Sequence, residues 1–356
     1  MISQKQKRSG CRKILVIGPS WIGDIMMSQS LYRLLVQLQL GVQIDVMAPP
    51  WCCPLLELMP EVNQALSIPI DHGAIALRKR LRLGQALQQN SYQQALVLPN
   101  SFKSALVPFF AGICHRTGWR GEMRYGLLND IRRLDKQAFP LMVQRYAALA
   151  FDSYLVQSAV DLPTPLPWPR LTAKAQEIND ALNVFLPELE RPLIGFCPGA
   201  EFGPAKRWPH YHYTVLAEAL IHRGYQIALF GSAKNHAVGK TIATALPADQ
   251  QRYCCNLVGK TTLVQVVNLI AACQGIISND SGLMHVASAL NRPMVALYGP
   301  SSPDCTPPLS PKAKVIRLID GYHKIRKGDD EQGYHYSLIA IQPKQVMSEL
   351  EKLLTP

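Results

Sequence analysis

The sequence predicts an α/β fold with two domains built on parallel sheets, on the strength of three observations. Short apolar strands alternate with helical segments along the chain, a pattern typical of parallel sheets. At 356 residues the chain is longer than a typical single hydrophobic core supports. A stretch at 161–170 has four prolines in ten residues and is interpreted as an extended linker. We therefore expect domains at 1–170 and 171–335, followed by a terminal segment at 336–356.

In the first domain, Lys13–Ile17 is predicted to be a buried strand, and the loop Gly18–Gly23 leads from it into a helix. This helix has leucines on one face, at positions 31, 34, 35 and 38. Two more strands are expected at Gln43–Met47 and Gln94–Leu98. The first βα turn of an open sheet is where ligands usually bind, but this loop is neither GxGxxG nor a P-loop. A dinucleotide oxidoreductase or an NTPase is therefore disfavoured.

The second domain repeats the same alternation of strand and helix. Five strands are predicted, and they lie at Leu193–Phe196, Gln226–Phe230, Gly275–Ser278, Met294–Tyr298 and Ala313–Arg317. A last helix is expected over about Gln342–Leu354. The two halves share only this generic rhythm, and no repeat of 20 to 50 residues is visible.

The turn Asn279–Gly282 is the most informative local feature. It follows a strand and opens a helix, where free N–H groups and the helix dipole favour a phosphate. Asp280 supplies a carboxylate, Ser281 a hydroxyl, and Gly282 lets a ligand approach the backbone. This combination suits a sugar linked through a pyrophosphate. The alternative is that Asp280 or Ser281 simply caps the helix.

Two other loops strengthen the phosphate interpretation. Asp24 opens the first helix; it is either functional or an acidic residue that complements the helix dipole. After the strand Leu193–Phe196, a loop rich in glycine and proline ends in Lys206 and Arg207. Cations there can lie near a phosphate, whereas the alternative is an ordinary solvated pair.

The amino-acid sequences of these loops resemble those of the bacterial lipopolysaccharide heptosyltransferases. The similarity rests on CPGAEFGPAKRWP, NDSGLMHVASALNRP and LYGPSSPDCTPPLS, and it extends from about Lys13 to about Leu350. It implies the GT-B fold, in which two Rossmann-like domains face each other across a central cleft and the nucleotide lies mainly on the second. It also implies that the last helix, in 336–356, crosses back to the first domain.

The resemblance implies inverting transfer of L-glycero-D-manno-heptose from ADP-heptose to the first heptose of heptosyl-Kdo-lipid A. Asp24 is expected to be the base and Lys206 to neutralise the leaving diphosphate. The expected donor-binding residues are Ser281, Gly282, Asp280, His285, Gly231 and Ser232. His285 is equally well explained as a packed helix residue, and Asn235 stands where a carboxylate for the ribose would be natural. No cofactor and no metal site are expected.

Two other functions remain open at this point. One is a related heptosyltransferase that adds the first heptose to Kdo. The other is a non-catalytic protein that binds a nucleotide sugar or a glycolipid. The presence of both Asp24 and Lys206 argues against a mere binder, which has no need of a base.

Positive charge is concentrated in the first half of the chain. Residues 1–170 have 19 Lys and Arg against 10 Asp and Glu, and residues 171–356 have 18 against 15. Nucleic acid is disfavoured because no binding motif is present. An anionic lipid surface or a phosphorylated glycolipid acceptor fits better. The expected acceptor and membrane surface comprises Arg78, Lys79, Arg80, Arg82, Arg120 and Arg124, with Arg116, Arg132 and Arg133 as further candidates.

The chain has no apolar run of membrane-spanning length and no signal-peptide pattern. Its nine cysteines are scattered, which favours a reducing compartment. We therefore expect a cytoplasmic protein that is peripheral on the inner face of the cytoplasmic membrane. The segment Phe102–Cys114 is either a buried core helix or an element that enters the lipid interface.

Overall fold

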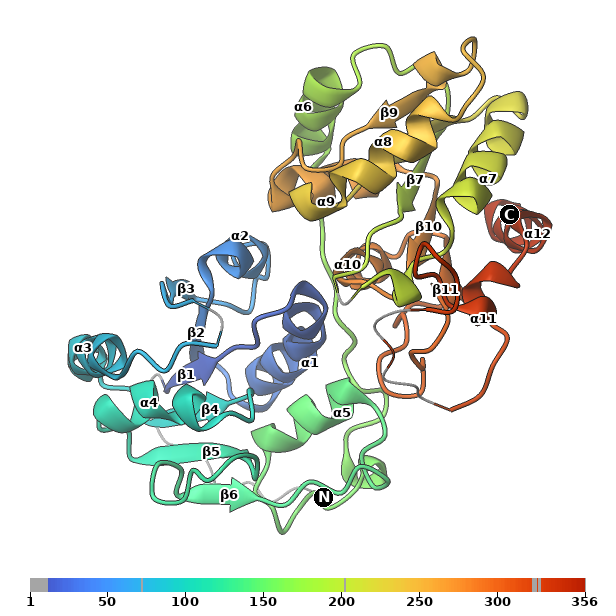
Figure 1. The fold of residues 1–356 in the computed structure, drawn as a ribbon. Helices are drawn as coiled ribbons and strands as arrows, with labels where there is room; N and C mark the ends of the chain where they lie inside the picture. The colour runs from blue at the N-terminus through green and yellow to red at the C-terminus, as the bar shows by residue number, and fades with distance from the viewer. Residues whose placement is uncertain (1–11, 72, 202, 322–324, 326–327, 356) are drawn as a thin grey trace. The chain divides into compact units, whose positions relative to one another are not determined.

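The computed structural model describes residues 12–71, 73–201, 203–321, 325 and 328–355. It divides into two compact units (Figure 1). The first unit comprises residues up to Ser20 together with Ser28–Pro167. The second comprises Trp21–Met27 together with Trp168–Pro356. The boundary between Pro167 and Trp168 lies inside the proline-rich stretch, whereas Trp21–Met27, which contains Asp24, clusters with the second unit.

The first unit contains a parallel sheet of six strands in the order β3-β2-β1-β4-β5-β6. The strands are β1 Lys13–Ile17, β2 Gln43–Ala48, β3 Gln64–Ser67, β4 Gln94–Val97, β5 His115–Trp119 and β6 Asp130–Arg132. Ile17 lies opposite both Met47 and Val97, so β1 is central. The strand order reverses between β1 and β4, which makes the carboxyl ends of these strands the topological switch point.

The second unit repeats this arrangement in the order β12-β11-β10-β7-β8-β9. Its strands are β7 Leu193–Cys197, β8 Gln226–Leu229, β9 Cys254–Asn256, β10 Gly275–Asn279, β11 Met294–Tyr298 and β12 Ala313–Arg317. Here the order reverses between β7 and β10, which pair directly and place Ser278 opposite Cys197. The two parallel sheets confirm the predicted fold class.

The helices connect successive strands. In the first half of the chain they are α1 Ile22–Leu38, α2 Cys53–Leu56, α3 Leu77–Leu87, α4 Leu106–Phe110 and α5 Met142–Ala147. In the second half they are α6 Ala175–Phe185, α7 His210–His222, α8 His236–Thr244, α9 Leu263–Ala272, α10 Gly282–Ala289, α11 Tyr336–Ile339 and α12 Pro343–Leu354. In the described chain no helix is long and apolar enough to cross a bilayer.

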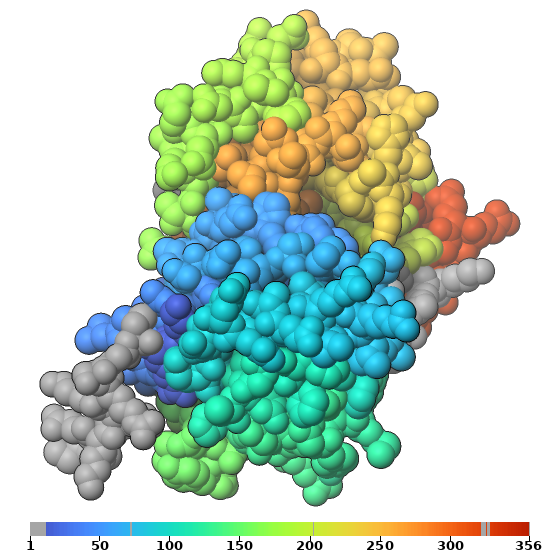
Figure 2. Space-filling model, turned by 90° about the vertical axis from the view of Figure 1, so that its left-hand side faces the viewer, coloured from blue at the N-terminus to red at the C-terminus, as the bar shows by residue number. Residues whose placement is uncertain are grey.

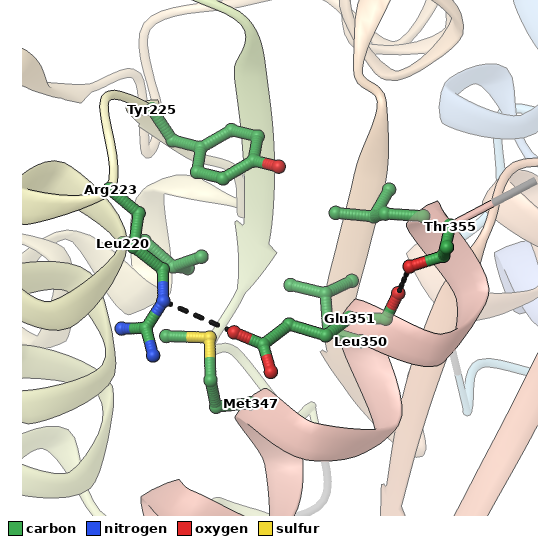
Figure 3. Close-up of a pocket in the computed structure, with 8 residues that line it drawn as sticks. Leu220, Arg223, Tyr225, Met347, Leu350, Glu351 and Thr355 are labelled. Carbon is green, nitrogen blue, oxygen red and sulfur yellow. Dashed lines mark hydrogen bonds and ion pairs between the residues drawn. The ribbon is translucent and has the colours of Figure 1, made fainter.

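The last helix has nearly the predicted extent. α12 spans Pro343–Leu354 and belongs to the second unit. It lies beside α7, and Val346 and Leu350 enter the core formed with the strands of the second sheet (Figure 1). At its outer edge Glu351 pairs with Arg223 of the α7 end at 3.1 Å (Figure 3). The apolar face of α12 is therefore covered by its own unit.

Four strands were missed by the sequence pattern: β3, β5, β6 and β9. These strands are short or polar, and β3, β6 and β9 form sheet edges. The residues of these edge strands are mostly half-exposed or exposed, so the strands lack the continuous apolar run of a strand buried on both faces. The pattern therefore found mainly the buried central strands.

The segment Phe102–Cys114 is mainly part of the core. It contains a 3₁₀ turn, Phe102–Ala105, followed by α4, and Leu106 and Val107 are buried. Among its large side chains, Phe102 and Phe109 are exposed, each at 41%. The core interpretation of this segment thus holds, apart from these two rings.

Candidate active site

An ion pair stands at the switch point of the second sheet. Nζ of Lys206 lies 2.8 Å from Oδ2 of Asp280, and the two side chains are 19% and 12% exposed. Lys206 ends the loop after β7, and Asp280 directly follows β10. Because β7 and β10 are neighbours, their carboxyl ends bring residues that are 74 positions apart into contact. This arrangement contradicts the solvated-pair interpretation of Lys206.

Asn279 fixes the two loops relative to each other. Its side-chain oxygen accepts hydrogen bonds from the backbone N–H of Trp208 at 3.0 Å and from the Tyr213 hydroxyl at 3.2 Å. Its amide donates to the carbonyl of Pro198 at 2.8 Å. Asn279 is fully buried, so these bonds are not shared with bulk water. The sequence interpretation placed Asn279 in the turn but did not give it this role.

The N-terminus of α10 lies directly beside the ion pair. Ser281 is the N-cap residue, and its side chain makes no capping hydrogen bond to the helix. The simple capping alternative is therefore wrong for Ser281, whose hydroxyl lies 3.3 Å from that of Ser278. The free N–H groups of the first helical turn remain available for an anion. Asp280 pairs with Lys206 instead of capping the helix.

Two glycines allow the start of α1 to approach α10 within the second unit. A Cβ on Gly282 would lie 2.8 Å from Cβ of Ile22, and a Cβ on Gly23 would lie 2.8 Å from Cδ2 of His285. Both contacts are too close for a side chain. Asp24 is the next residue after Gly23 and lies in the first turn of α1. The backbone of Asp24 is therefore held close to the N-terminus of α10, the helix end that suits a phosphate.

His285 is buried, as the packed-histidine alternative expected. Burial lowers its pKa from 6.5 to about 4, against the opposing attraction of Asp280 and with a smaller contribution from Lys206. The imidazole is consequently neutral at physiological pH. His285 contributes shape to the site, and its ring fills the space opposite Gly23.

The loop after β8 contains Gly231 and Ser232, but Asn235 in this loop is already engaged. Its amide donates to Oγ of Ser232 at 3.1 Å, and its oxygen accepts from Arg207 at 3.1 Å. A Cβ on Gly199 would lie 2.6 Å from the same amide nitrogen. Asn235 thus joins the loops after β7 and β8, and Arg207 is part of the scaffold.

The predicted surface cations do not all lie on the surface. Arg80 is 6% exposed and donates to the carbonyls of Ala74 and Ile75. Arg124 is 1% exposed and donates to Pro99, Trp119 and neighbouring groups. Both predictions are wrong, because these guanidiniums satisfy loop carbonyls that would otherwise be buried without partners.

The other basic residues predicted for the acceptor and membrane surface also include buried and exposed side chains. Arg132 is also buried and pairs with Asp130. The exposed cations of the predicted surface are Arg78, Lys79, Arg82 and Arg120, and Arg133 is exposed as well.

Comparison with known proteins agrees with this geometry. The model of glycosyltransferase family 9 (heptosyltransferase) matches residues 80–335. Lipopolysaccharide heptosyltransferase 2 of Escherichia coli K12 is 65% identical over 342 residues, which cover 96% of this chain and 98% of that protein. Lipooligosaccharide heptosyltransferase 2 of Haemophilus influenzae is 56% identical over 346 residues, 96% of this chain and 99% of the relative.

A solved structure is also similar to this chain. The structure of E. coli ADP-heptose lps heptosyltransferase II matches with a TM-score of 0.90 and 61% identity, and the match covers 96% of this chain and 98% of that one. The fold and the site thus define a glycosyltransferase with two doubly wound sheets. The chain belongs to glycosyltransferase family 9, the heptosyltransferases.

The burial of His285 predicts a dependence of stability on pH. Below pH 6.5 the unfolded chain binds a proton that folded His285 rejects down to about pH 4. The free energy of unfolding should therefore fall across this window as the pH is lowered, by up to about 3 kcal/mol from this residue.

Urea unfolding of wild type and His285→Gln between pH 7 and pH 4 measures this effect. The variant should lose that part of the slope, while His236→Gln, which changes an exposed histidine of α8, should keep it. Equal slopes for wild type and His285→Gln would contradict the prediction.

Proposed function

We propose that this heptosyltransferase is an inverting enzyme that transfers L-glycero-D-manno-heptose from ADP-heptose to the first heptose of heptosyl-Kdo-lipid A, in synthesis of the lipopolysaccharide inner core. The Lys206–Asp280 pair at the switch point is the observation that carries this proposal. It supplies a cation for a diphosphate and a carboxylate for sugar hydroxyls at one place in the fold.

The sequence identities to these relatives support transfer of the second heptose of the inner core. Four relatives named heptosyltransferase 2 are 56–65% identical over 96% of the chain, and two from Campylobacter jejuni are 27–29% identical over about half of it. Lipopolysaccharide heptosyltransferase 1 of Pseudomonas aeruginosa is 23% identical over 308 residues. Product analysis with ADP-heptose and defined truncated acceptors tests the assignment. Transfer to Kdo-lipid A but not to heptosyl-Kdo-lipid A would favour a first-heptose enzyme instead.

The donor side of the mechanism rests on Lys206 and the α10 N-terminus. The ammonium of Lys206 stabilises the negative charge that develops as ADP leaves, and N–H groups after Ser281 hold phosphate oxygens. Gly282 has no side chain, which lets Ile22 at the start of α1 pack against this helix end. Asp280 then accepts hydrogen bonds from heptose hydroxyls.

Asp24 is the proposed general base. Its carboxylate takes the proton from the acceptor hydroxyl, whose oxygen attacks the anomeric carbon of the donor. The bond from this carbon to the phosphate oxygen breaks, and ADP leaves with the electron pair. A single displacement of this kind inverts the anomeric centre. Gly23, packed beside His285, supports this position for Asp24.

The acceptor is proposed to reach the enzyme at an anionic membrane face. The chain has no acidic residue between Asp71 and Glu122, and it has exposed cations at Arg78, Lys79 and Arg82. α3 places these cations beside the exposed side chains of Leu77 and Leu81. Figure 2 turns the side of the first unit that contains α3 toward the viewer. Basic residues mixed with exposed leucines suit an anionic lipid surface.

The role of Asp24 predicts the behaviour of Asp24→Asn. This variant should fold and bind ADP as wild type does, because the amide keeps the shape of the side chain. Turnover should fall by about 100-fold or more, the range for loss of a general base. Steady-state kinetics with ADP-heptose measure this, and turnover near wild type would leave Asp24 as a helix-dipole residue only.

Loss of the Lys206 ammonium should weaken the donor complex. Lys206→Ala is expected to reduce ADP affinity by about 1.5–3 kcal/mol, the range for a hydrogen bond to a charged group. Calorimetry with ADP is the measurement, and Lys240→Ala on α8 is the matched control, because that lysine is exposed. Unchanged ADP affinity in Lys206→Ala would exclude the diphosphate role.

The α3 cations should govern vesicle binding. The triple change Arg78→Gln, Lys79→Gln and Arg82→Gln removes about 3 kcal/mol of attraction, which is roughly a hundredfold in partition to anionic vesicles. ADP affinity should not change. Cosedimentation with phosphatidylglycerol vesicles measures the partition.

The control changes three exposed lysines of the second unit, Lys174, Lys240 and Lys312, to Gln. If both triple variants bind vesicles as wild type does, the α3 cations are an ordinary solvated surface. If both lose binding equally, the attraction depends on net charge and not on α3.

A further inference from the structure

A small loop near the C-terminus is closed by its own backbone. The N–H of Gly328 donates to the carbonyl of Gly333 at 2.8 Å, and the N–H of Asp329 donates to the carbonyl of Tyr334 at 2.8 Å. The carboxylate of Asp330 accepts from the N–H of Tyr334 at 2.6 Å. These hydrogen bonds fix the conformation of the loop from Gly328 to Tyr334.

This loop packs against the segment that contains Lys206. A Cβ on Gly333 would lie 2.6 Å from Cγ and 3.2 Å from Cβ of Pro204. Pro204 begins the 3₁₀ turn Pro204–Lys206, so it lies one turn from the ammonium-bearing residue. Gly333 also has φ +81°, a conformation that favours glycine. A residue with a side chain at 333 would therefore press on the turn that positions Lys206.

The same loop holds the other side of Lys206. The hydroxyl of the buried Tyr334 lies 2.9 Å from Nδ1 of His210 and accepts from the backbone N–H of His210 at 3.4 Å. His210 is the first residue of α7. Gly333 thus contacts Pro204, which precedes Lys206 in the sequence, and Tyr334 contacts His210, which follows it.

Two further bonds continue this attachment. Nε1 of Trp208 donates to the carbonyl of Ile341 at 2.9 Å, and Nε2 of His212 lies 2.9 Å from the carbonyl of Ile339. Between residues 204 and 212 the chain is therefore tied at four points to residues 333–341. The opposite side of this stretch is tied to the sheet through Asn279.

We propose that Gly333 and Tyr334 are positioning residues, which fix the Lys206 turn so that its ammonium meets the donor diphosphate. This inference rests on the proposed function, because it assumes that role for Lys206. A charged group stabilises a developing charge best when its position is fixed before the reaction. The Gly- and Pro-rich loop after β7 has little secondary structure of its own to fix it.

The test is a pair of substitutions with a built-in rescue. Gly333→Ala adds a Cβ that must displace Pro204, and ADP affinity should fall about tenfold, together with kcat/KM. Adding Pro204→Ala removes the Cγ and leaves 3.2 Å to the nearest remaining atom of residue 204. The double variant should recover most of the lost affinity.

Gly224→Ala is the matched control for backbone strain. Gly224 lies in the same unit with φ +84°, and a Cβ there would meet nothing within 4 Å. This variant has the same conformational penalty without the clash, so its ADP affinity should equal that of wild type. Tyr334→Phe is the second variant. It removes only the hydroxyl facing His210 and should weaken ADP binding several-fold even if Gly333→Ala does not fold.

The outcomes separate this inference from the proposed function. If Lys206→Ala leaves ADP affinity unchanged, the diphosphate role of Lys206 fails, and the positioning role fails with it. If Lys206→Ala weakens binding while Gly333→Ala matches Gly224→Ala, only the positioning role is overturned. A double variant as weak as Gly333→Ala overturns it too. Unchanged affinity in Tyr334→Phe overturns the positioning role of Tyr334.

Discussion

The ion pair between Lys206 and Asp280 is the interaction on which the site depends. Both side chains are mostly withdrawn from water, which costs several kcal/mol per ion unless the geometry repays it. A pair of this kind contributes little to stability compared with an apolar contact of the same size. Its presence at a sheet switch point is better explained by function, because a diphosphate can become the partner of the lysine.

The pair can exist only because its two loops are fixed. Asn279 joins them from the sheet side, since it accepts from Trp208 and Tyr213 and donates to Pro198. Trp208 is fully buried and binds Ile341 with its indole N–H. The position of a flexible lysine is thus determined by rigid neighbours on several segments. The geometry of the site consequently depends on the packing of the core of the second unit.

The sequence predicted the central strands and the loops that follow them, because buried strands show continuous apolar runs. The central strands Lys13–Ile17 and Met294–Tyr298 have the predicted bounds, and so does the edge strand Ala313–Arg317. Lys206 and Asp280 were both named, but their contact was not, since 74 residues separate them and only the strand order brings them together.

Other features could not be read from local patterns. Arg80 and Arg124 belong to basic clusters in the sequence, yet loop carbonyls bind them inside the protein. An arginine that satisfies buried carbonyls has the same sequence signature as one that faces a membrane. Likewise, the apolar face of α12 predicts that the helix is covered, but not which unit covers it. The contact of Gly333 with Pro204 depends on tertiary packing alone.

The most direct test of the donor site is a crystal structure of the protein with ADP bound. We expect the diphosphate to lie at the carboxyl ends of β7 and β10, with one oxygen within about 3 Å of Nζ of Lys206 and another at the N-terminus of α10. A diphosphate bound elsewhere, with no phosphate oxygen near Nζ of Lys206, would contradict this assignment.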